Sequence, residues 1–194
     1  MINIPYASEP RPDTGVTNAT LGMWLFIASE VMLFGSLFSS YALLRIGAPT
    51  WPDQSATLNV GLATVNTVIL IASSVAILRA SRAAAEGAIR GFRQAMAITV
   101  LCGIGFLAIK AVEYRGELLA GLLPATNNFI GLYFTLTGLH ALHVIAGIAA
   151  NAWAIAGATR VGEAMMAGRT RALALYWVFV DIVWLIIFGL MYLL

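Results

Sequence analysis

The chain has 194 residues, of which 60% are hydrophobic and 10% are charged, and its formal net charge is +2. A soluble domain is typically about 45–50% apolar and about 25% charged. This composition excludes a disordered chain, a nucleic-acid binder with a basic face and an ordinary cytosolic enzyme, and it indicates an integral membrane protein. Cys102 is the single cysteine, so an internal disulfide and a cysteine-ligated metal cluster are excluded.

Five segments are long and apolar enough to cross a bilayer core of about 30 Å as helices. The residues before them are polar and lack the basic start and short apolar run of a secretory signal. We therefore expect a cytoplasmic tail over residues 1–20, followed by an all-α transmembrane bundle over residues 21–194. The predicted helices cover about residues 21–44, 57–78, 94–114, 128–157 and 172–194.

The arginines divide unevenly between the two sides of the predicted bundle. Eight lie in the tail and in two of the connections, whereas two lie on the opposite side. Cytoplasmic loops of membrane proteins carry an excess of positive charge, which places the N-terminus in the cytoplasm and the C-terminus outside. The first set is Arg11, Arg79, Arg82, Arg90, Arg93, Arg160, Arg169 and Arg171, and the second is Arg45 and Arg115.

Ionisable side chains inside the predicted helices are the strongest candidates for function, because a charge in hydrocarbon costs several kcal/mol. Helix lengths, at about 1.5 Å per residue, place Glu30, His140 and Asp181 at similar depth. We expect Glu30 and His140 to share a hydrogen-bonded site, with His143 and Asp181 as further buried polar partners. The alternative is that each group bonds to its own helix. Glu30 is the candidate for a proton-linked group that reacts with carbodiimide.

A second ionisable pair lies on the third predicted helix. Lys110 and Glu113 are three residues apart, so their side chains can pair on one helix face. We expect Lys110 to extend its ammonium toward the membrane interface and to anchor the helix there. A proton path through the pair is the alternative.

Several further residues are predicted to pack helices together or to face lipid. Asn66 lies between Asn59 and Ser73 at steps of seven residues, which is typical of a polar seam that forms interhelical hydrogen bonds. Gly138 offers a small surface for close approach of a neighbouring helix. Trp177, with Lys110 and Glu113, completes this group of lipid or packing candidates.

The two histidines do not predict a haem or metal site. His140 and His143 lie one turn apart on one helix, whereas two-histidine haem ligation in a bundle needs ligands on facing helices. A carboxylate-bridged metal cluster needs about four Glu and two His from four helices. We expect no metal and no catalytic residue in this chain, and any redox centre to lie in another chain.

Several motifs follow one another in a distinctive order. They are GMWLFIASEVMLFGSLFSSY at 22–41 with Glu30 inside it, Trp51-Pro52, Asn66-Thr67, Glu113-Tyr114, TGLHALHVIAG at 137–147 and YWVFVDIVWL at 176–185. Together they resemble subunit III of the haem–copper terminal oxidases, the cytochrome c oxidase family, in its short five-helix bacterial form. The chain departs from the family at Val178, where many members have histidine, and at Lys110, where mitochondrial members have glutamine.

The resemblance implies a non-redox subunit of a respiratory oxidase that couples oxygen reduction to proton pumping in the bacterial cytoplasmic (inner) membrane. Such a subunit docks on subunit I beside subunit II, binds phospholipid, and supports proton uptake and stability. Haem and copper belong to those partners, and a larger respiratory supercomplex is a further partner to consider.

Two alternatives to the oxidase interpretation stay open. One is a subunit III-like accessory protein of a nitric oxide reductase, which shares the five-helix pattern. The other is an independent membrane transporter. Transporters often show inverted repeats and helices broken near the midplane. The chain has no evident repeat and no proline inside the five predicted spans, which favours the oxidase interpretation.

Overall fold

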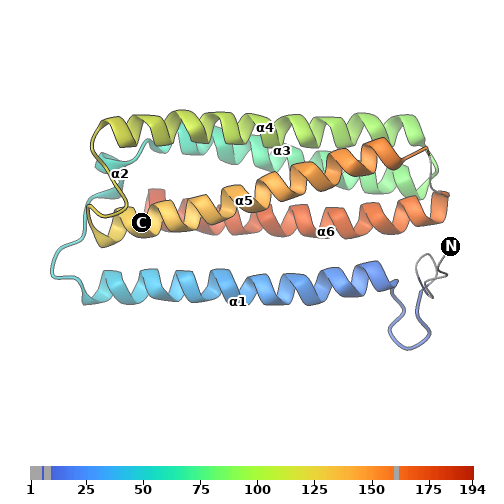
Figure 1. Cartoon of the computed structure of the whole chain (residues 1–194), viewed down its shortest axis with the longest axis horizontal. Helices are drawn as coiled ribbons and strands as arrows, with labels where there is room; N and C mark the ends of the chain where they lie inside the picture. The colour runs from blue at the N-terminus through green and yellow to red at the C-terminus, as the bar shows by residue number, and fades with distance from the viewer. Residues whose placement is uncertain (1–5, 7–9, 160–161) are drawn as a thin grey trace.

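The computed structural model describes residues 6, 10–159 and 162–194, and these residues form helices and no strand. Five of the helices are long and apolar enough to cross a membrane, which confirms the predicted fold class. A short helix lies in the connection after the first of them, and the last continues into a π-helical turn (Figure 1). The elements are α1 (Asn18–Gly47), α2 (Gln54–Thr57), α3 (Val60–Ala85), α4 (Ile89–Leu119), α5 (Asn128–Gly157), α6 (Glu163–Phe188) and η1 (Gly189–Leu193).

The helices differ from the predicted segments mainly at their ends. The predicted second helix began at residue 57, but Thr57 is the last residue of α2. Asn59 caps α3 instead, since its side chain accepts a hydrogen bond from the Leu62 N–H at 3.0 Å. At the other end α3 runs on to Ala85 rather than stopping at 78. Alanine and arginine favour helix outside the hydrocarbon as well as inside it, so hydropathy alone underestimates the helix length.

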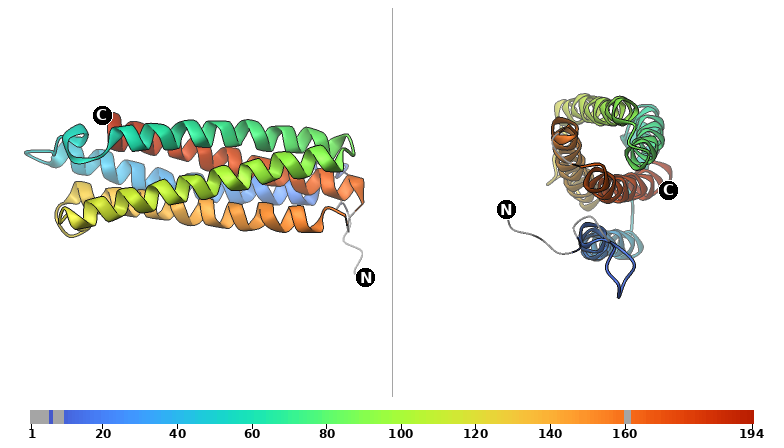
Figure 2. Two further views of the ribbon diagram at one scale, coloured as in Figure 1. Left: turned by 90° about the horizontal axis from the view of Figure 1, so that it is seen from above. Right: turned by 90° about the vertical axis from the view of Figure 1, so that its right-hand side faces the viewer.

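Helices α3, α4, α5 and α6 form a four-helix group, and α1 stands beside it (Figures 1 and 2). In the group α3 packs on α4 and α6, and α5 packs on α4 and α6. We call the end with α2, residues 120–127 and η1 the α2 end. The opposite end, where α1 begins, is the N-terminal end.

Only a narrow stripe of α1 is buried against α5 and α6. Its buried residues recur at steps of seven, while large apolar side chains elsewhere on it are exposed, such as Met32 at 78% and Ile46 at 83%. The stripe consists of Thr20, Ile27, Phe34 and Tyr41. An apolar helix that is exposed on most of its surface fits a lipid environment, in which helices gain little from burying apolar area.

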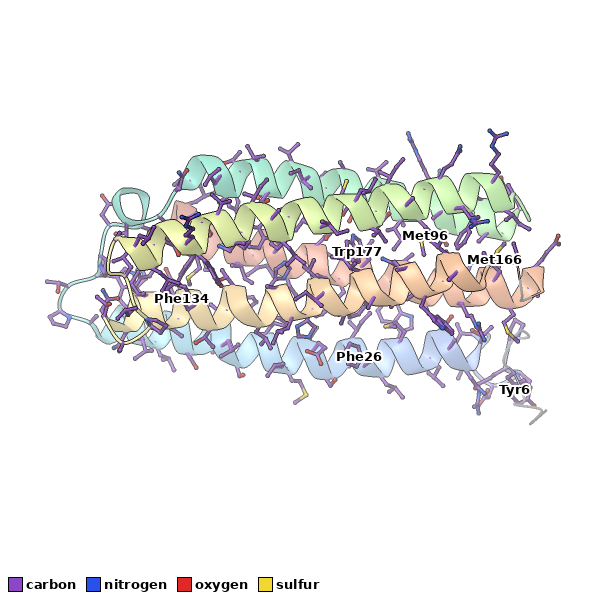
Figure 3. All side chains as sticks on the ribbon, turned by 45° about the horizontal axis from the view of Figure 1, so that its top comes forward. Tyr6, Phe26, Met96, Phe134, Met166 and Trp177 are labelled. Atoms are coloured by element: carbon purple, nitrogen blue, oxygen red, sulfur yellow. The ribbon has the colours of Figure 1, made fainter. Side chains whose placement is uncertain are left out.

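Trp177 fills the interior of the four-helix group (Figure 3). A Cβ atom at Gly147 of α5 would lie 2.7 Å from Trp177 Cζ3, and one at Gly103 of α4 would lie 2.9 Å from Trp177 Cη2. The two glycines therefore make room for the indole. The close approach expected at Gly138 is not found, because the nearest atom there, the Tyr114 hydroxyl, would lie 3.8 Å away.

Gly147→Ala is expected to destabilise the chain by about 1–3 kcal/mol, because the added methyl group would overlap the rigid Trp177 ring. The matched control is Gly35→Ala on α1, where a Cβ atom meets nothing within 4 Å. The measurement is the thermal unfolding midpoint of each variant in mild detergent. Equal midpoints for the two variants would contradict the tight contact.

Candidate functional site

Glu30 of α1 contacts His143 of α5 and so links α1 to the four-helix group. Glu30 Oε2 lies 3.0 Å from His143 Nε2, and each side chain is 13% exposed. His143 Nδ1 lies 2.8 Å from the Leu139 carbonyl oxygen, which can only accept, so Nδ1 carries a hydrogen and donates it. A second proton must then lie between Oε2 and Nε2, on either atom, because two bare acceptors would repel. The pair therefore shares one proton.

Neighbouring side chains hold this pair in place. The Phe34 ring of α1 packs edge-on against the imidazole of His143, with ring centroids 5.2 Å apart. The Tyr176 hydroxyl of α6 donates to the His143 carbonyl oxygen at 2.8 Å. The proton-sharing pair is thus positioned by three helices, on the side of the group that α1 covers.

The expected contact between Glu30 and His140 is wrong. His140 is fully buried between the rings of Phe106 and Trp184, at centroid distances of 5.4 and 5.2 Å. Neither of its ring nitrogens has a hydrogen-bond partner among the described residues. Side chains three residues apart on an α-helix point in directions that differ by about 60°. His143 therefore faces α1 while His140 faces the interior.

Asp181 is also separate from Glu30. Its Oδ2 atom accepts hydrogen bonds from the hydroxyls of Ser73, at 3.3 Å, and Ser74, both on α3. The carboxyl thus joins α6 to α3 within the four-helix group. Among the described residues, no three His, Cys, Asp or Glu side chains gather in a way that could hold a metal ion.

Asn66 and Trp177 form interhelical hydrogen bonds within the group. The Asn66 amide nitrogen donates to the Phe106 carbonyl oxygen at 3.4 Å, and Trp177 Nε1 donates to the Ser73 hydroxyl at 2.8 Å. Both side chains are fully buried. The predicted polar seam on α3 is therefore real at Asn66 and Ser73. Asn59 does not belong to it, because it caps the helix.

Lys110 lies in a buried polar cluster near the α2 end. Its Nζ atom lies 2.8 Å from the Tyr133 hydroxyl, 2.7 Å from the Tyr192 hydroxyl and 3.1 Å from Glu113 Oε2. The predicted pair with Glu113 is present. The predicted extension toward the interface is wrong, since Lys110 is only 3% exposed. The hydroxyls of Tyr133 on α5 and Tyr192 on η1 accept hydrogen bonds from the Lys110 ammonium, in place of the water that would solvate it at the interface.

Glu117 is the member of this cluster that the sequence interpretation missed. Its Oε1 atom lies 2.8 Å from the Tyr133 hydroxyl, and the residue is 7% exposed. The predicted helix ended at 114, before Glu117. A usable signal was the spacing of Lys110, Glu113 and Glu117, which places all three on one face of a longer helix. We call Lys110, Glu113, Glu117, Tyr133 and Tyr192 the Lys110 cluster.

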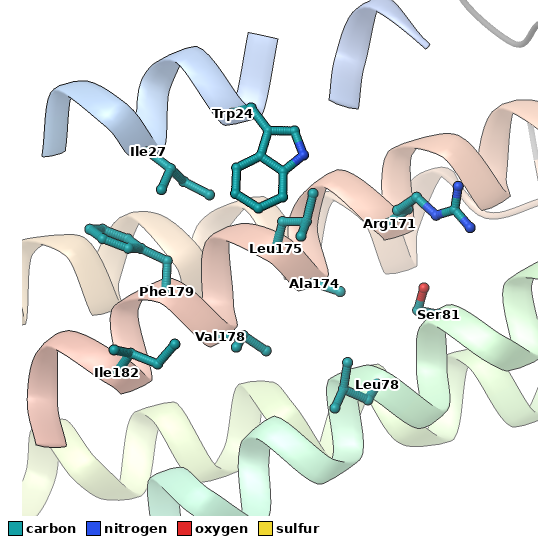
Figure 4. Close-up of a pocket in the computed structure, with 10 residues that line it drawn as sticks. All are labelled: Trp24, Ile27, Leu78, Ser81, Arg171, Ala174, Leu175, Val178, Phe179 and Ile182. Carbon is teal, nitrogen blue, oxygen red and sulfur yellow. The ribbon is translucent and has the colours of Figure 1, made fainter. Parts of the chain in front are cut away.

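Two adjoining cavities lie between α1 and the four-helix group. One, of about 420 Å³, is lined mainly by apolar side chains, with Arg171 and Ser81 at one end and Ile182 toward the other (Figure 4). The second, also of about 420 Å³, lies at the N-terminal end, and Thr17 and Arg82 are among its lining residues. Arg171 and Ser81 line both cavities, so an apolar space lies next to a basic, hydroxyl-lined one.

Known proteins resemble this chain over nearly its full length. Residues 13–194 match the family "Cytochrome c oxidase subunit III". The chain is 37% identical to cytochrome c oxidase subunit 3 of Thermostichus vulcanus, over 100% of this chain and 93% of that protein. It is 32% identical to cytochrome bo(3) ubiquinol oxidase subunit 3 of Pseudomonas putida, over 90% of this chain and 84% of that protein.

A further relative is a longer protein. The chain is 32% identical to "Heme-copper oxidase subunit I+III" of Aeropyrum pernix, over 95% of this chain and 23% of that protein. These matches confirm the resemblance predicted from the motifs.

A lipid-soluble carbodiimide is expected to modify Glu30, because the reagent needs a protonated carboxyl and Glu30 shares a proton with His143. Glu30→Gln should abolish this modification and leave the fold intact. Glu163→Gln is the control, since that carboxyl is exposed at the start of α6 and should not affect labelling of Glu30. Peptide mass spectrometry locates the adduct. An unmodified Glu30 in the unaltered protein would contradict the shared proton.

Proposed function

This chain belongs to the cytochrome c oxidase subunit III family, and from that premise we propose that it is a non-redox subunit of a respiratory haem–copper oxidase. It docks on subunit I in an assembly that also contains subunit II. The observation that carries docking is the likeness to the Aeropyrum pernix protein, whose name joins subunits I and III. The relatives include both a cytochrome c oxidase and a ubiquinol oxidase subunit, so the proposal does not depend on the electron donor.

We assign haem and copper to the partner subunits. The chain has two histidines, both on α5. His143 is engaged with Glu30 and Leu139, and His140 is enclosed by aromatic rings. Neither is paired with a histidine on a facing helix, as a two-histidine haem site in a bundle requires.

The proposed location is the bacterial cytoplasmic membrane, with the N-terminal end of the bundle facing the cytoplasm. Arg82 near the end of α3, Arg90 at the start of α4 and Arg169 in α6 support this orientation, since positive charge accumulates on the cytoplasmic side. Arg160, counted in the same set, lies outside the described residues.

We propose that a phospholipid occupies the two adjoining cavities. Acyl chains suit the apolar cavity, which Ile27 and Phe179 help to line. A phosphate group suits the adjoining cavity, where the guanidinium groups of Arg82 and Arg171 can donate charge-assisted hydrogen bonds. The position of α1 beside the four-helix group supports this proposal, because it leaves space that protein side chains do not fill.

The Glu30–His143 pair supports a proton-linked role. A carboxyl and an imidazole that share one proton can pass it between Oε2 and Nε2 over 3.0 Å. Both side chains are partly exposed on the α1 side of the group. On this proposal the pair assists proton uptake by subunit I and helps to keep the complex stable during turnover.

The docking proposal predicts that the tagged chain, purified in mild detergent, carries partner subunits with it. A reduced-minus-oxidised visible spectrum should show haem, and mass spectrometry should identify a large, many-helix subunit in the same fraction. A colourless chain that elutes alone in several mild detergents would contradict docking.

The lipid proposal predicts that Arg171→Gln lowers the phospholipid that co-purifies with the chain by at least one molecule. The physical reason is the loss of a guanidinium group from both cavities. Arg93→Gln is the matched control, because Arg93 is exposed on α4 and lines neither cavity. Phosphorus analysis and native mass spectrometry measure the bound lipid. An equal lipid content in the two variants would refute the assignment.

A further inference from the structure

We propose that the Lys110 cluster is a proton-binding site, which holds one exchangeable proton on Glu117 near the α2 end of the bundle. The inference rests on contacts among the five residues of the cluster. It depends neither on docking to other subunits nor on the Glu30–His143 pair.

The contacts between tyrosine hydroxyls and carboxyl oxygens outnumber the hydrogens that the tyrosines supply. Three contacts of 3.0 Å or less join a tyrosine hydroxyl to a carboxyl oxygen in the cluster. Each tyrosine provides one O–H group, and the lysine N–H groups cannot bridge two oxygens. Each contact needs one hydrogen between its two oxygens, so the two tyrosine hydrogens leave one contact without a proton.

The deficit lies at Tyr133. Its hydroxyl oxygen lies 3.0 Å from Glu113 Oε1 and 2.8 Å from Glu117 Oε1, but the hydroxyl has one hydrogen to donate. The Tyr192 hydroxyl already donates to Glu113 Oε1 at 2.6 Å. A hydrogen on Glu117 Oε1, donated to the Tyr133 oxygen, satisfies the remaining contact. Tyr133 then donates to Glu113.

Charge balance independently supports the same proton. With both carboxyls ionised, the cluster would carry one positive and two negative charges, although its residues are at most 7% exposed. A buried, uncompensated charge is costly, and a proton on Glu117 removes it. The ionised carboxyl is then Glu113, which receives the Lys110 ammonium and the Tyr192 hydroxyl.

The second oxygen of Glu117 agrees with this assignment. Oε2 is buried and has no hydrogen-bond partner among the described residues. A bare carbonyl oxygen of a neutral acid is less costly to bury than a bare carboxylate oxygen. Glu113 Oε2 also has no hydrogen-bond partner among the described residues, but it lies 3.1 Å from the Lys110 ammonium, whose positive charge compensates an ionised carboxylate.

Within the part of the chain that the structure describes, the surroundings of the cluster add no further charged partner within hydrogen-bond distance. Lys110 lies against the ring faces of Tyr114 and Trp184 as well as those of the cluster tyrosines, at 4.7–5.6 Å from the centroids. The Tyr114 hydroxyl is engaged with Thr137 of α5. The Arg45 side chain of α1 bonds instead to the Tyr41 hydroxyl and the Leu194 carbonyl oxygen.

Access to the proton comes from the α2 end. Glu117 lies two residues before the last residue of α4, Leu119, which is about 3 Å along the helix axis. Lys110 lies deeper, about 13–14 Å from the same point. Glu117, at 7%, is also the most exposed member of the cluster.

The test compares two isosteric substitutions on one helix in the full chain, purified in mild detergent with its co-eluting partners. A glutamine at 117 can donate from its amide to Tyr133, as a protonated glutamate does. Glu117→Gln should therefore keep the thermal stability of the unaltered protein. Glu113→Gln removes the ionised partner of Lys110 and should lower the unfolding midpoint clearly.

Infrared spectroscopy provides the second readout. The difference spectrum between the unaltered protein and Glu117→Gln should contain the carbonyl band of one protonated carboxylic acid, shifted after exchange into D₂O. Glu163→Gln, at an exposed site, should leave that band in place. The proposal is overturned if the band persists in Glu117→Gln, or if Glu117→Gln lowers the unfolding midpoint as much as Glu113→Gln does.

Discussion

A membrane interior supplies no water to buried polar groups, so hydrogen bonds between them stabilise the helix contacts in which they form. This constraint explains how the four-helix group is joined. Ser73 receives the indole N–H of Trp177 and helps to hold Asp181, and Thr67 receives the indole N–H of Trp184 at 3.0 Å. These bonds connect α3 to α6 through the interior. Apolar burial contributes less, since lipid is as apolar as the helix surfaces it would cover.

The same constraint explains why α1 can stand apart from the group. Its serine hydroxyls are satisfied within the helix, as when Ser36 donates to the Leu33 carbonyl oxygen at 2.7 Å. Its polar links to the other helices lie at Glu30, Tyr41 and Arg45. A helix held by a narrow stripe and a few polar contacts leaves room beside it, and the two adjoining cavities occupy that room.

Two groups of side chains in this chain each hold a proton, the Glu30–His143 pair and the Lys110 cluster. At Glu30 and His143 one proton joins two helices, and the pair lies at the edge of the bundle. In the Lys110 cluster the ammonium, two phenols and two carboxyls form a buried network in which one carboxyl is ionised. Burial makes such a network costly unless every partner is satisfied. The cost explains why the cluster is assembled from three elements, α4, α5 and η1.

Much of the fold could be predicted from the sequence, because lipid selects for continuous apolar helices that are recognisable from composition and length. The family could also be predicted from the sequence, since motifs such as Ser29-Glu30-Val31 and TGLHALHVIAG stand in a characteristic order. Pairing of Lys110 with Glu113 followed from their spacing alone. These features depend on residues close together in the chain or on their order along it.

The hydrogen-bond partners of the buried ionisable side chains could not be predicted from the sequence. Whether Glu30 meets His140 or His143 depends on the rotation of α5 about its axis, which hydropathy does not report. Whether Lys110 reaches the interface depends on Tyr133 and Tyr192, which lie 23 and 82 residues away along the chain. The helices were therefore predictable from local chemistry. Their mutual rotation and the resulting polar contacts arise only from packing among segments distant in the sequence.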